Sequence, residues 1–398
     1  MMDLCGIGGD GMGGGSGVSF VAGLEGVAAA RTRISGVDGE AGVLTLAGFP
    51  VEELAGRASF EEVVYLLRHD GLPDAEEFAA FRTALAGRRG LPGATVDLLR
   101  AAAARGVSGM DALRMAADTL SLDVSDDPAL DLVARFPVIV ATYQRLLSGE
   151  EPIQPDEGLG HAANYLYMLR GEVPGEGSVR ALETYLCTVS DHGMNASTFA
   201  ARVIVATRSD LVSAVVGAVG ALKGPLHGGA PGPALDVVFE IEATGNAEAV
   251  LREKLRRGER LMGFGHRIYR VRDPRADVLA AAAERLFASD GDRDLYDLAL
   301  NVEETALRLL AEHRPGRNLQ TNVEFYRALL LHGLGLPTEL FTPTFAVGRV
   351  AGWTAHCLEQ QAEDRLIRPQ SEYVGAEDRR WVPPGERPSP RSREALPE

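Results

Sequence analysis

The chain has 398 residues, of which 45% are hydrophobic and 24% are charged. These values are ordinary for a globular protein with a sizeable core, built as one large domain or two. The formal net charge of −16 argues against bulk binding to nucleic acid or to an anionic membrane, so an anionic ligand would need a local basic pocket.

The three cysteines, Cys5, Cys187 and Cys357, are too widely spaced to form a metal or disulfide pattern. A reducing cytoplasm is the simplest compartment for such a chain. We find neither the pattern of a signal peptide nor an apolar run long enough to span a bilayer. We therefore expect a cytoplasmic protein.

The first 22 residues are glycine-rich, and we expect them to be disordered. They contain Gly6-x-Gly8-x-x-Gly11, which matches the pattern of dinucleotide-binding loops. That pattern binds a nucleotide only when a strand precedes it and a helix follows it. Neither is predicted here, so we do not interpret the pattern as a nucleotide site.

Residues 23–48 contain two β-like runs, RTRIS and VLTL, around a Val-Asp-Gly turn, which predicts a small hairpin. After Pro50 the pattern becomes helical, and Ser59 followed by acidic residues is typical of a helix N-cap. The apolar spacing between Gly and Pro boundaries predicts further helices at 75–88, 94–105, 108–121, 128–148, 158–170 and 175–194. Strand-like segments are few, so the predicted fold is mainly α.

Between residues 223 and 335, glycine-rich turns join the helical segments. We interpret 223–335 as a small helical domain inserted into a large helical domain formed by 23–222 and 336–375. Pockets favour domain interfaces, so we expect the site in the cleft between them. Residues 376–398 are predicted to form a charged, proline-rich tail.

The most unusual stretch is MGFGHRIYRVRDPR, which runs from Met262 to Arg275. Arginine suits bidentate binding of carboxylate or phosphate, and His266 could protonate an oxygen of a bound anion. A basic surface turn is the alternative interpretation of this stretch alone.

Five other residues stand in distinctive surroundings. His192 follows Asp191 in DHGMNAS, His227 stands in GPLHGGA, and Glu324 lies in the apolar-aromatic run NVEFY. Arg349 and Arg368 are charged residues in otherwise apolar segments of the sequence. Each has an ordinary alternative, such as a buried or capping histidine, a solvated helix charge or a salt-bridge partner.

The order of the stretches DHGMNASTF, GPLHGGA, GFGHRIYRVRDPR, NVEFY, FAVGRVAGW and RLIRPQSEYVG resembles the citrate synthase family. The match extends from GLEGVAAARTRISGVDGEAG to about Gly375. It implies a large and a small helical domain with the active site between them, and a homodimer. It also implies condensation of acetyl-CoA with oxaloacetate, followed by hydrolysis to citrate and CoA, without a metal or another cofactor.

The resemblance also implies roles for individual residues. Glu324 would be the base that removes a methyl proton from the thioester, His227 the donor to the thioester oxygen, and His266 the acid at the oxaloacetate carbonyl. The residues matched to oxaloacetate binding are His192, Arg275, Arg349 and, from the neighbouring subunit, Arg368. The residues matched to CoA binding are Arg270, Gly263, Phe264 and Gly265.

One departure concerns the base, because the family usually has aspartate in NVDFY where this chain has Glu324. A displacement of about 1 Å can cost about a hundredfold in rate, so we expect local backbone shifts that restore the reach of the carboxylate. Two alternatives stay open: a 2-methylcitrate synthase that uses propionyl-CoA, and a non-catalytic paralogue that binds acyl-CoA or a dicarboxylate. A Ser/His/Asp hydrolase is disfavoured because no Gly-x-Ser-x-Gly motif accompanies the histidines.

Overall fold

A computed structural model describes residues 20–228, 231–266, 268–289 and 292–386. The chain divides into two compact units, Ala29–Ile367 and a second unit formed by Met1–Ala28 with Arg368–Glu398. The Gly6-x-Gly8-x-x-Gly11 pattern, most of the predicted N-terminal segment and the last twelve residues of the predicted tail lie outside the described residues.

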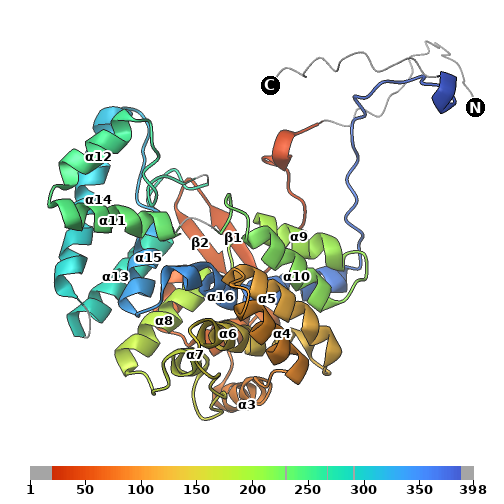
Figure 1. Cartoon of the computed structure of the whole chain (residues 1–398), viewed down its shortest axis with the longest axis horizontal. Coiled ribbons are helices and arrows are strands. Elements are labelled where there is room, and N and C mark those ends of the chain that lie inside the picture. The colour runs from red at the N-terminus through yellow and green to blue at the C-terminus, as the bar shows by residue number, and fades with distance from the viewer. Residues whose placement is uncertain (1–19, 229–230, 267, 290–291, 387–398) are drawn as a thin grey trace, which may run out of the picture. The chain divides into compact units, whose positions relative to one another are not determined.

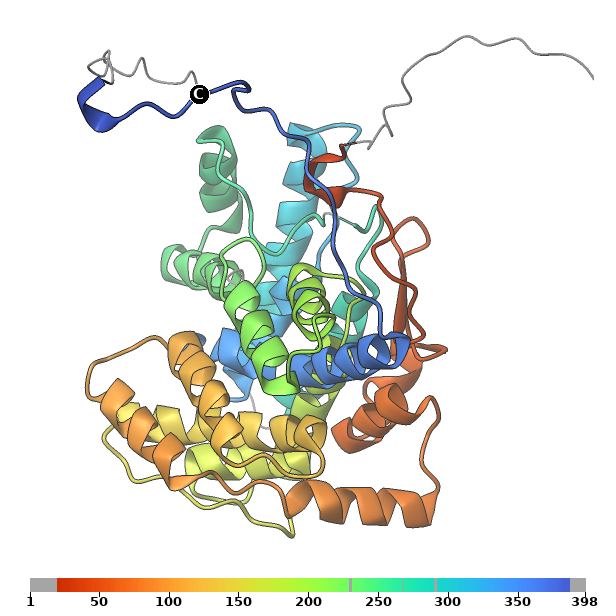
Figure 2. The same ribbon diagram turned by 90° about the vertical axis from the view of Figure 1, so that its right-hand side faces the viewer.

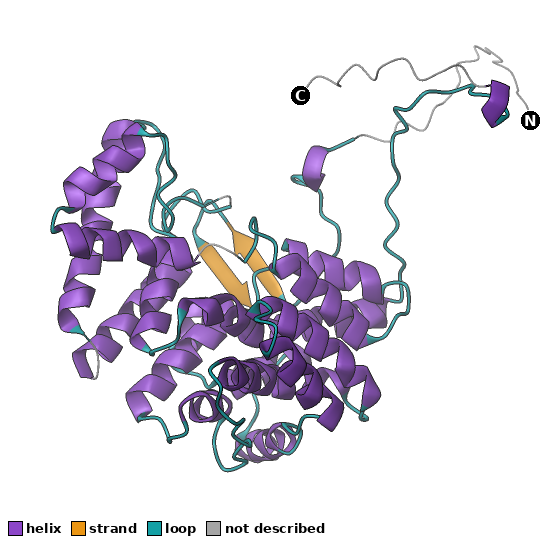
Figure 3. Cartoon of the chain, in the orientation of Figure 1, coloured by secondary structure: helices purple, strands orange, loops and turns teal. Residues whose placement is uncertain are grey.

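Helices dominate the Ala29–Ile367 unit, as Figure 3 shows, and the predicted mainly α fold is confirmed. The α-helices are α1 (Val51–Leu54), α2 (Phe60–His69), α3 (Ala75–Ala86), α4 (Gly93–Ala103), α5 (Gly109–Thr119), α6 (Pro128–Leu147), α7 (His161–Arg170), α8 (Glu176–Val189), α9 (Ala196–Val205), α10 (Leu211–Leu222), α11 (Pro231–Thr244), α12 (Ala247–Arg256), α13 (Pro274–Ser289), α14 (Arg293–His313), α15 (Val323–Gly333) and α16 (Phe341–Glu363). The short 3-10 helices are η1 (Ala22–Leu24), η2 (Leu120–Leu122), η3 (Thr338–Leu340) and η4 (Pro384–Glu386). Within the described residues, none of these helices has the length and apolar character needed to cross a membrane.

The helix signals in the sequence are confirmed in most places. Ser59 forms a capping box with Glu62 at the start of α2. The helix predicted over 175–194 is wrong at its end, because α8 stops at Val189. The chain turns there because Gly193 takes a left-handed conformation with φ +60° and the buried Asp191 side chain accepts hydrogen bonds from Ser35, Gly193 and His356, outside the helix.

The predicted hairpin is confirmed as part of a three-stranded antiparallel sheet formed by β1 (Ser35–Asp38), β2 (Val43–Leu46) and β3 (Phe49–Pro50). The position of its first strand was wrong: Val37 and Asp38, predicted as turn, lie in β1 and pair with β2. The turn falls after them because the Asp38 carboxylate accepts hydrogen bonds from the backbone N–H groups of Glu40 and Ala41.

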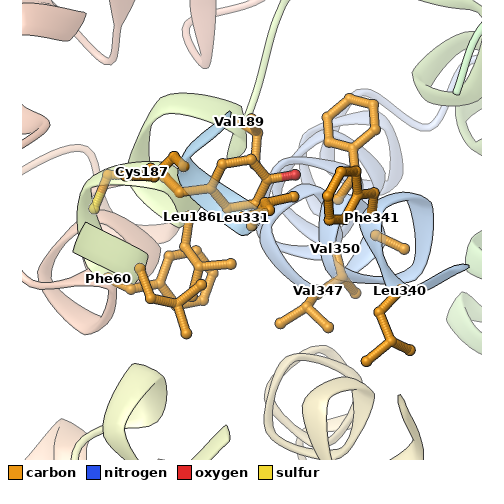
Figure 4. Packing of buried hydrophobic residues seen from close by; sticks show 14 of the residues in the cluster. Phe60, Leu186, Cys187, Val189, Leu331, Leu340, Phe341, Val347 and Val350 are labelled. Carbon is orange, nitrogen blue, oxygen red and sulfur yellow. The ribbon is translucent and has the colours of Figure 1, made fainter. Parts of the chain in front are cut away.

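Helix α16 lies in the middle of the Ala29–Ile367 unit (Figure 1). Its residues from Pro343 to Cys357 are buried on all sides, whereas its last residues are exposed. Figure 4 shows side chains of α16, among them Phe341, Val347 and Val350, packed in one apolar cluster with residues of α8 and α15. Two glycines let α16 approach the end of α8 closely. A Cβ at Gly348 would lie 2.6 Å from a methyl of Val189, and one at Gly352 would lie 2.4 Å from the Ser190 carbonyl oxygen.

Helices α11, α12 and α14 gather at one side of the Ala29–Ile367 unit, away from α3 to α7, in both Figure 1 and Figure 2. Helices α13 and α15 pack against each other and against α8, which joins this group to the remaining helices. The predicted domain boundaries at 222/223 and 335/336 stay a prediction. The arrangement places α13 and α15, which carry Arg275 and Glu324, next to α8, and α16, which carries Arg349, against the end of α8.

Candidate active site

His192 lies in the loop that follows α8 and is buried. The loop is held by Asp191, whose carboxylate accepts hydrogen bonds from the Ser35 hydroxyl, the Gly193 backbone N–H (2.9 Å) and His356 (3.3 Å). On the other side, α16 contributes Arg349, whose Nε donates to the Val189 carbonyl oxygen across 2.6 Å. The close packing of α16 on the end of α8 therefore brings Arg349 to the loop of His192.

His266 faces His192, with ring centroids 5.9 Å apart. Tyr269 lies beside both rings and its hydroxyl is 3.1 Å from Nε2 of His192. Nδ1 of His266 accepts hydrogen bonds from the backbone N–H groups of Ile268 (3.0 Å) and Tyr269 (3.1 Å). Because Nδ1 accepts these two hydrogen bonds, we assign the proton of the neutral ring to Nε2.

Arg275, in the first turn of α13, completes this group. Its Nη2 is 3.4 Å from Nε2 of His266. Two nitrogens of its guanidinium donate to the buried carboxylate of Asp273, at 3.0 and 2.8 Å. Burial alone would raise the pKa of Asp273, but the charge and hydrogen bonds of Arg275 outweigh it and the pKa is lowered. The pair thus presents an ionised guanidinium held at a fixed place.

The Gly263-Phe264-Gly265 segment is fixed against the start of α15. Gly263 and Gly265 both have left-handed backbones, with φ +91° and +79°. Phe264 forms an antiparallel bridge with Thr321, and the Gly263 carbonyl accepts a hydrogen bond from Asn322 N at 2.9 Å. The segment before His266 and the helix that carries Glu324 are therefore joined through the backbone.

His227 lies in the loop before α11, which begins at Pro231 beyond two residues outside the described part. Its Nε2 is 2.8 Å from the Ser197 hydroxyl in the first turn of α9. The Ser197 hydroxyl accepts a hydrogen bond from the indole N–H of Trp353 (3.0 Å) and donates one to Oδ1 of Asn195 (2.7 Å). These contacts fix the orientation of the His227 ring.

Glu324 lies in the first turn of α15, and its side chain is 18% exposed. Its backbone N–H donates to the side chain of Asn322, the N-cap of the helix, at 2.9 Å. One carboxylate oxygen accepts a hydrogen bond from Arg327, one turn later, at 3.2 Å. The predicted base is therefore half-buried and paired with a cation.

The electrostatics link these segments into one site. Burial, followed by the charges of Arg349 and Arg327, lowers the pKa of His227 to about 4. Burial, followed by the charge of Arg275, likewise lowers the pKa of His266 to about 4. Both imidazoles are therefore neutral near pH 7 and can each donate one N–H. Burial and the charges of Arg275 and Arg349 hold the pKa of His192 well below its usual value.

The structure does not test two of the predicted contacts. Arg270 is exposed, and its nearest acidic partner is Glu40 at 3.9 Å. Arg368 belongs to the compact unit that also contains residues 1–28. Their roles in binding CoA and oxaloacetate stay predictions. Within the described part of the chain there is also no group of three or more His, Cys, Asp or Glu residues arranged to hold a metal ion.

The sequence reasoning missed several residues that hold the site together, namely Ser197, Tyr269, Asp273 and Arg327. Arg327 could have been found, because an arginine three residues after Glu324 on a helix is a standard spacing for an ion pair. Ser197 and Tyr269 were inside the quoted motifs, but only the folded arrangement shows which atoms they contact.

Comparison with known proteins agrees with this arrangement. Residues 23–370 match the protein family described as citrate synthase, C-terminal domain. The citrate synthase of Haloferax volcanii is 41% identical over 92% of this chain and 98% of its own length. The 2-methylcitrate synthase of Mycobacterium tuberculosis is 40% identical over 90% of this chain and 91% of its own length. Sequence identity therefore does not distinguish a citrate synthase from a 2-methylcitrate synthase here.

A solved structure gives the same picture. The chain superposes with a TM-score of 0.84 and 29% sequence identity on the ternary complex of carboxymethyl coenzyme A and oxaloacetate with citrate synthase from Thermoplasma acidophilum. The match covers 93% of this chain and all of that one (100%).

Proposed function

Because the chain belongs to the citrate synthase family, we propose that it condenses acetyl-CoA with oxaloacetate and hydrolyses the citryl-CoA that forms to citrate and CoA. It is an enzyme of the acyltransferase class. The observation that carries the proposal is that each of the three predicted catalytic residues lies by a buried arginine. His266 is 3.4 Å from Arg275, Glu324 pairs with Arg327, and the charges of Arg349 and Arg327 act on His227.

The first step is removal of a methyl proton from the thioester by Glu324. A carboxylate cannot do this unaided, so a donor must hold the thioester oxygen as the enol or enolate forms. We assign that role to His227. In this assignment the Ser197 hydroxyl donates its hydrogen bond to Nε2 of His227 in place of Oδ1 of Asn195, so the proton of neutral His227 is on Nδ1 and is donated from that atom. A donor of this kind is typically worth about 3 kcal/mol of barrier.

The second step is attack of the enol carbon on the oxaloacetate carbonyl. His266 donates a proton to the carbonyl oxygen from Nε2, the nitrogen that its backbone contacts leave protonated. A neutral donor suits this step, because the nearby Arg275 disfavours a second positive charge on the ring. Water then hydrolyses the thioester of citryl-CoA.

Oxaloacetate is a dianion, and we propose that His192, Arg275 and Arg349 hold its carboxylates. The anchored Arg275–Asp273 pair and the fixed Arg349 side chain support this assignment, because guanidinium groups held in place bind carboxylates in a defined orientation. Arg270 and the Gly263-Phe264-Gly265 backbone would contact CoA. Histidine and arginine side chains supply the electrophilic groups, so we propose no metal or other cofactor.

We further propose a cytoplasmic homodimer in which Arg368 reaches the site of the partner subunit. A complementation experiment tests whether Arg368 acts in the site of the partner subunit. Arg368→Ala and Glu324→Gln variants, each inactive alone, should regain activity when unfolded and refolded together, because one site of the hybrid dimer is then intact. Refolded mixtures without gain would place Arg368 in its own subunit's site or outside both.

The acyl preference is tested by competition. Equal concentrations of acetyl-CoA and propionyl-CoA are incubated with oxaloacetate, and the products are identified by mass. An excess of citrate supports the proposal. An excess of 2-methylcitrate would favour the second candidate, which the similarity to the Mycobacterium tuberculosis enzyme keeps open.

A further inference from the structure

Arg327 is a buried guanidinium that the proposed mechanism does not use. It lies in α15 one turn after Glu324, and its side chain is only 1% exposed. Its Nη1 donates to Oε1 of Glu324 at 3.2 Å, and its Nη2 lies 3.1 Å from Oε2. The arginine therefore faces the proposed base directly.

Within the described residues, Glu324 is the only acidic residue that forms an ion pair with Arg327. Arg275, in contrast, has the buried Asp273 as its partner, and Asp191 lies near Arg349. A buried charge without a partner is strongly disfavoured, so the loss of Glu324 would leave the Arg327 guanidinium as an uncompensated buried charge.

The ring of Phe345 fixes the position of the guanidinium. The centroid of the Phe345 ring lies 4.6 Å from Cζ of Arg327 and 4.7 Å from Cζ of Arg349, so the ring contacts both cations. Among the described residues, Nε and Nη2 of Arg327 and Oε2 of Glu324 have no hydrogen-bond partner. Oε1 of the carboxylate is thus held by a hydrogen bond, and Oε2 is held by the ion pair with Nη2 at 3.1 Å.

We propose that Arg327 is the positioning residue for Glu324. It donates to Oε1 and pairs with Oε2, so the planar guanidinium fixes where the carboxylate lies when it accepts the proton from the acyl-CoA. This inference rests on the proposed function, in which Glu324 is the base. It also explains how a glutamate serves at this position: the extra methylene carries the carboxylate to Arg327, which then fixes where it lies.

The test compares Arg327→Met and Arg327→Lys with the wild type, measuring kcat and the KM for oxaloacetate by thiol release. Arg327→Met should lower kcat about 10- to 100-fold, since a displaced base loses its alignment, while KM changes by less than about threefold. Arg327→Lys keeps the charge but not the planar fork, and its kcat should lie between those of Arg327→Met and the wild type.

Arg89→Met is the matched control for loss of a buried arginine. Arg89 is 2% exposed and donates to the Asp156 carbonyl oxygen at 2.7 Å, outside the site. This variant should lower the unfolding temperature without lowering kcat per folded molecule. If Arg327→Met does not fold, the double variant Glu324→Gln/Arg327→Met should, because it removes both charges, and its unfolding temperature should exceed that of Arg327→Met.

Three results would overturn the inference. One is an Arg327→Met enzyme with the kcat of the wild type. Another is an unchanged kcat with an oxaloacetate KM raised at least about tenfold, which would make Arg327 a contact of the substrate. The third is a double variant no more stable than the single one. Full activity of Glu324→Gln would instead contradict the proposed function itself, so the two failures can be told apart.

Discussion

The Ser197 hydroxyl lies 2.8 Å from Nε2 of His227 and receives a hydrogen bond from the indole of Trp353. The hydroxyl ties the loop before α11 to the start of α9 and to α16. A histidine that donates a proton must present the correct nitrogen, so this contact bears on the chemistry as well as on the packing.

Replacing Ser197 with Ala removes the partner of Nε2 and frees the His227 ring to change tautomer. We expect kcat to fall about 2- to 10-fold, the effect of one hydrogen bond of ordinary strength, with the oxaloacetate KM little changed. Steady-state kinetics check this. Ser213→Ala, which removes a hydroxyl bonded to Asp210 on the exposed end of α10, is the control. Equal kinetics for Ser197→Ala and the wild type would show that the hydroxyl does not orient His227.

Replacing Asp273 with Asn removes the charge that compensates the buried Arg275. We expect the free energy of unfolding to fall by about 3–5 kcal/mol, because breaking a buried pair leaves an uncompensated charge. Oxaloacetate binding should weaken as well, since Arg275 loses its fixed position. Urea unfolding and calorimetric titration measure the two effects.

Asp277 offers the comparison for that experiment. It is 63% exposed and pairs with Arg272 at 2.5 Å. Asp277→Asn should change stability by no more than about 1 kcal/mol. A similar small effect for Asp273→Asn would mean that Arg275 does not depend on its carboxylate partner.

His161 gives the fold a dependence on pH. The residue is fully buried, and its two ring nitrogens have no hydrogen-bond partner among the described residues. Burial, followed by the charge of Arg89, lowers its pKa to about 3 from the usual 6.5. The unfolded chain therefore binds a proton below pH 6.5 that the folded chain does not take up until about pH 3. The contribution of neutral His161 to the free energy of unfolding is fully present above pH 6.5 and is lost as the pH falls towards 3.

Urea unfolding at pH 7, 6 and 5 tests this. In His161→Leu, the fall in the free energy of unfolding on acidification should be smaller by up to about 1.4 kcal/mol per pH unit. Identical slopes in the variant and the wild type would show that His161 is not kept neutral by the fold.

The helices were largely predictable, because their signals are local. The Ser59 cap and the apolar spacing of α3 to α6 need no knowledge of the rest of the chain. The strand β1 was misplaced because its limits follow from pairing with β2, and Ser35 to Asp38 carry little alternation of their own. The end of α8 was misplaced for a similar reason, since contacts of Asp191 with distant residues determine it.

The site was predictable only through the family resemblance. His192, His266 and Arg275 stand far apart or in different loops, and spacing does not show that they meet. The partners that orient them come from other elements, such as Tyr269 for His192. The Glu324–Arg327 pair is the exception, because both residues lie on one helical turn.

Shortening the base tests whether Glu324 is fitted to its surroundings. Glu324→Asp withdraws the carboxylate by about one methylene, and we expect kcat to fall about a hundredfold with little change in the oxaloacetate KM. Steady-state kinetics at saturating acetyl-CoA measure this. A kcat well above that of the wild type would show instead that the glutamate is a poorly placed base.

The most direct measurement is thiol release from acetyl-CoA, with and without oxaloacetate, by the wild type and by Glu324→Gln. We expect release by the wild type only when oxaloacetate is present, and a loss of about 100- to 10,000-fold in the variant, the range for removal of a general base. Oxaloacetate-dependent release by Glu324→Gln at the wild-type rate would remove Glu324 from the mechanism. A wild type that binds oxaloacetate but releases no thiol would contradict catalysis altogether.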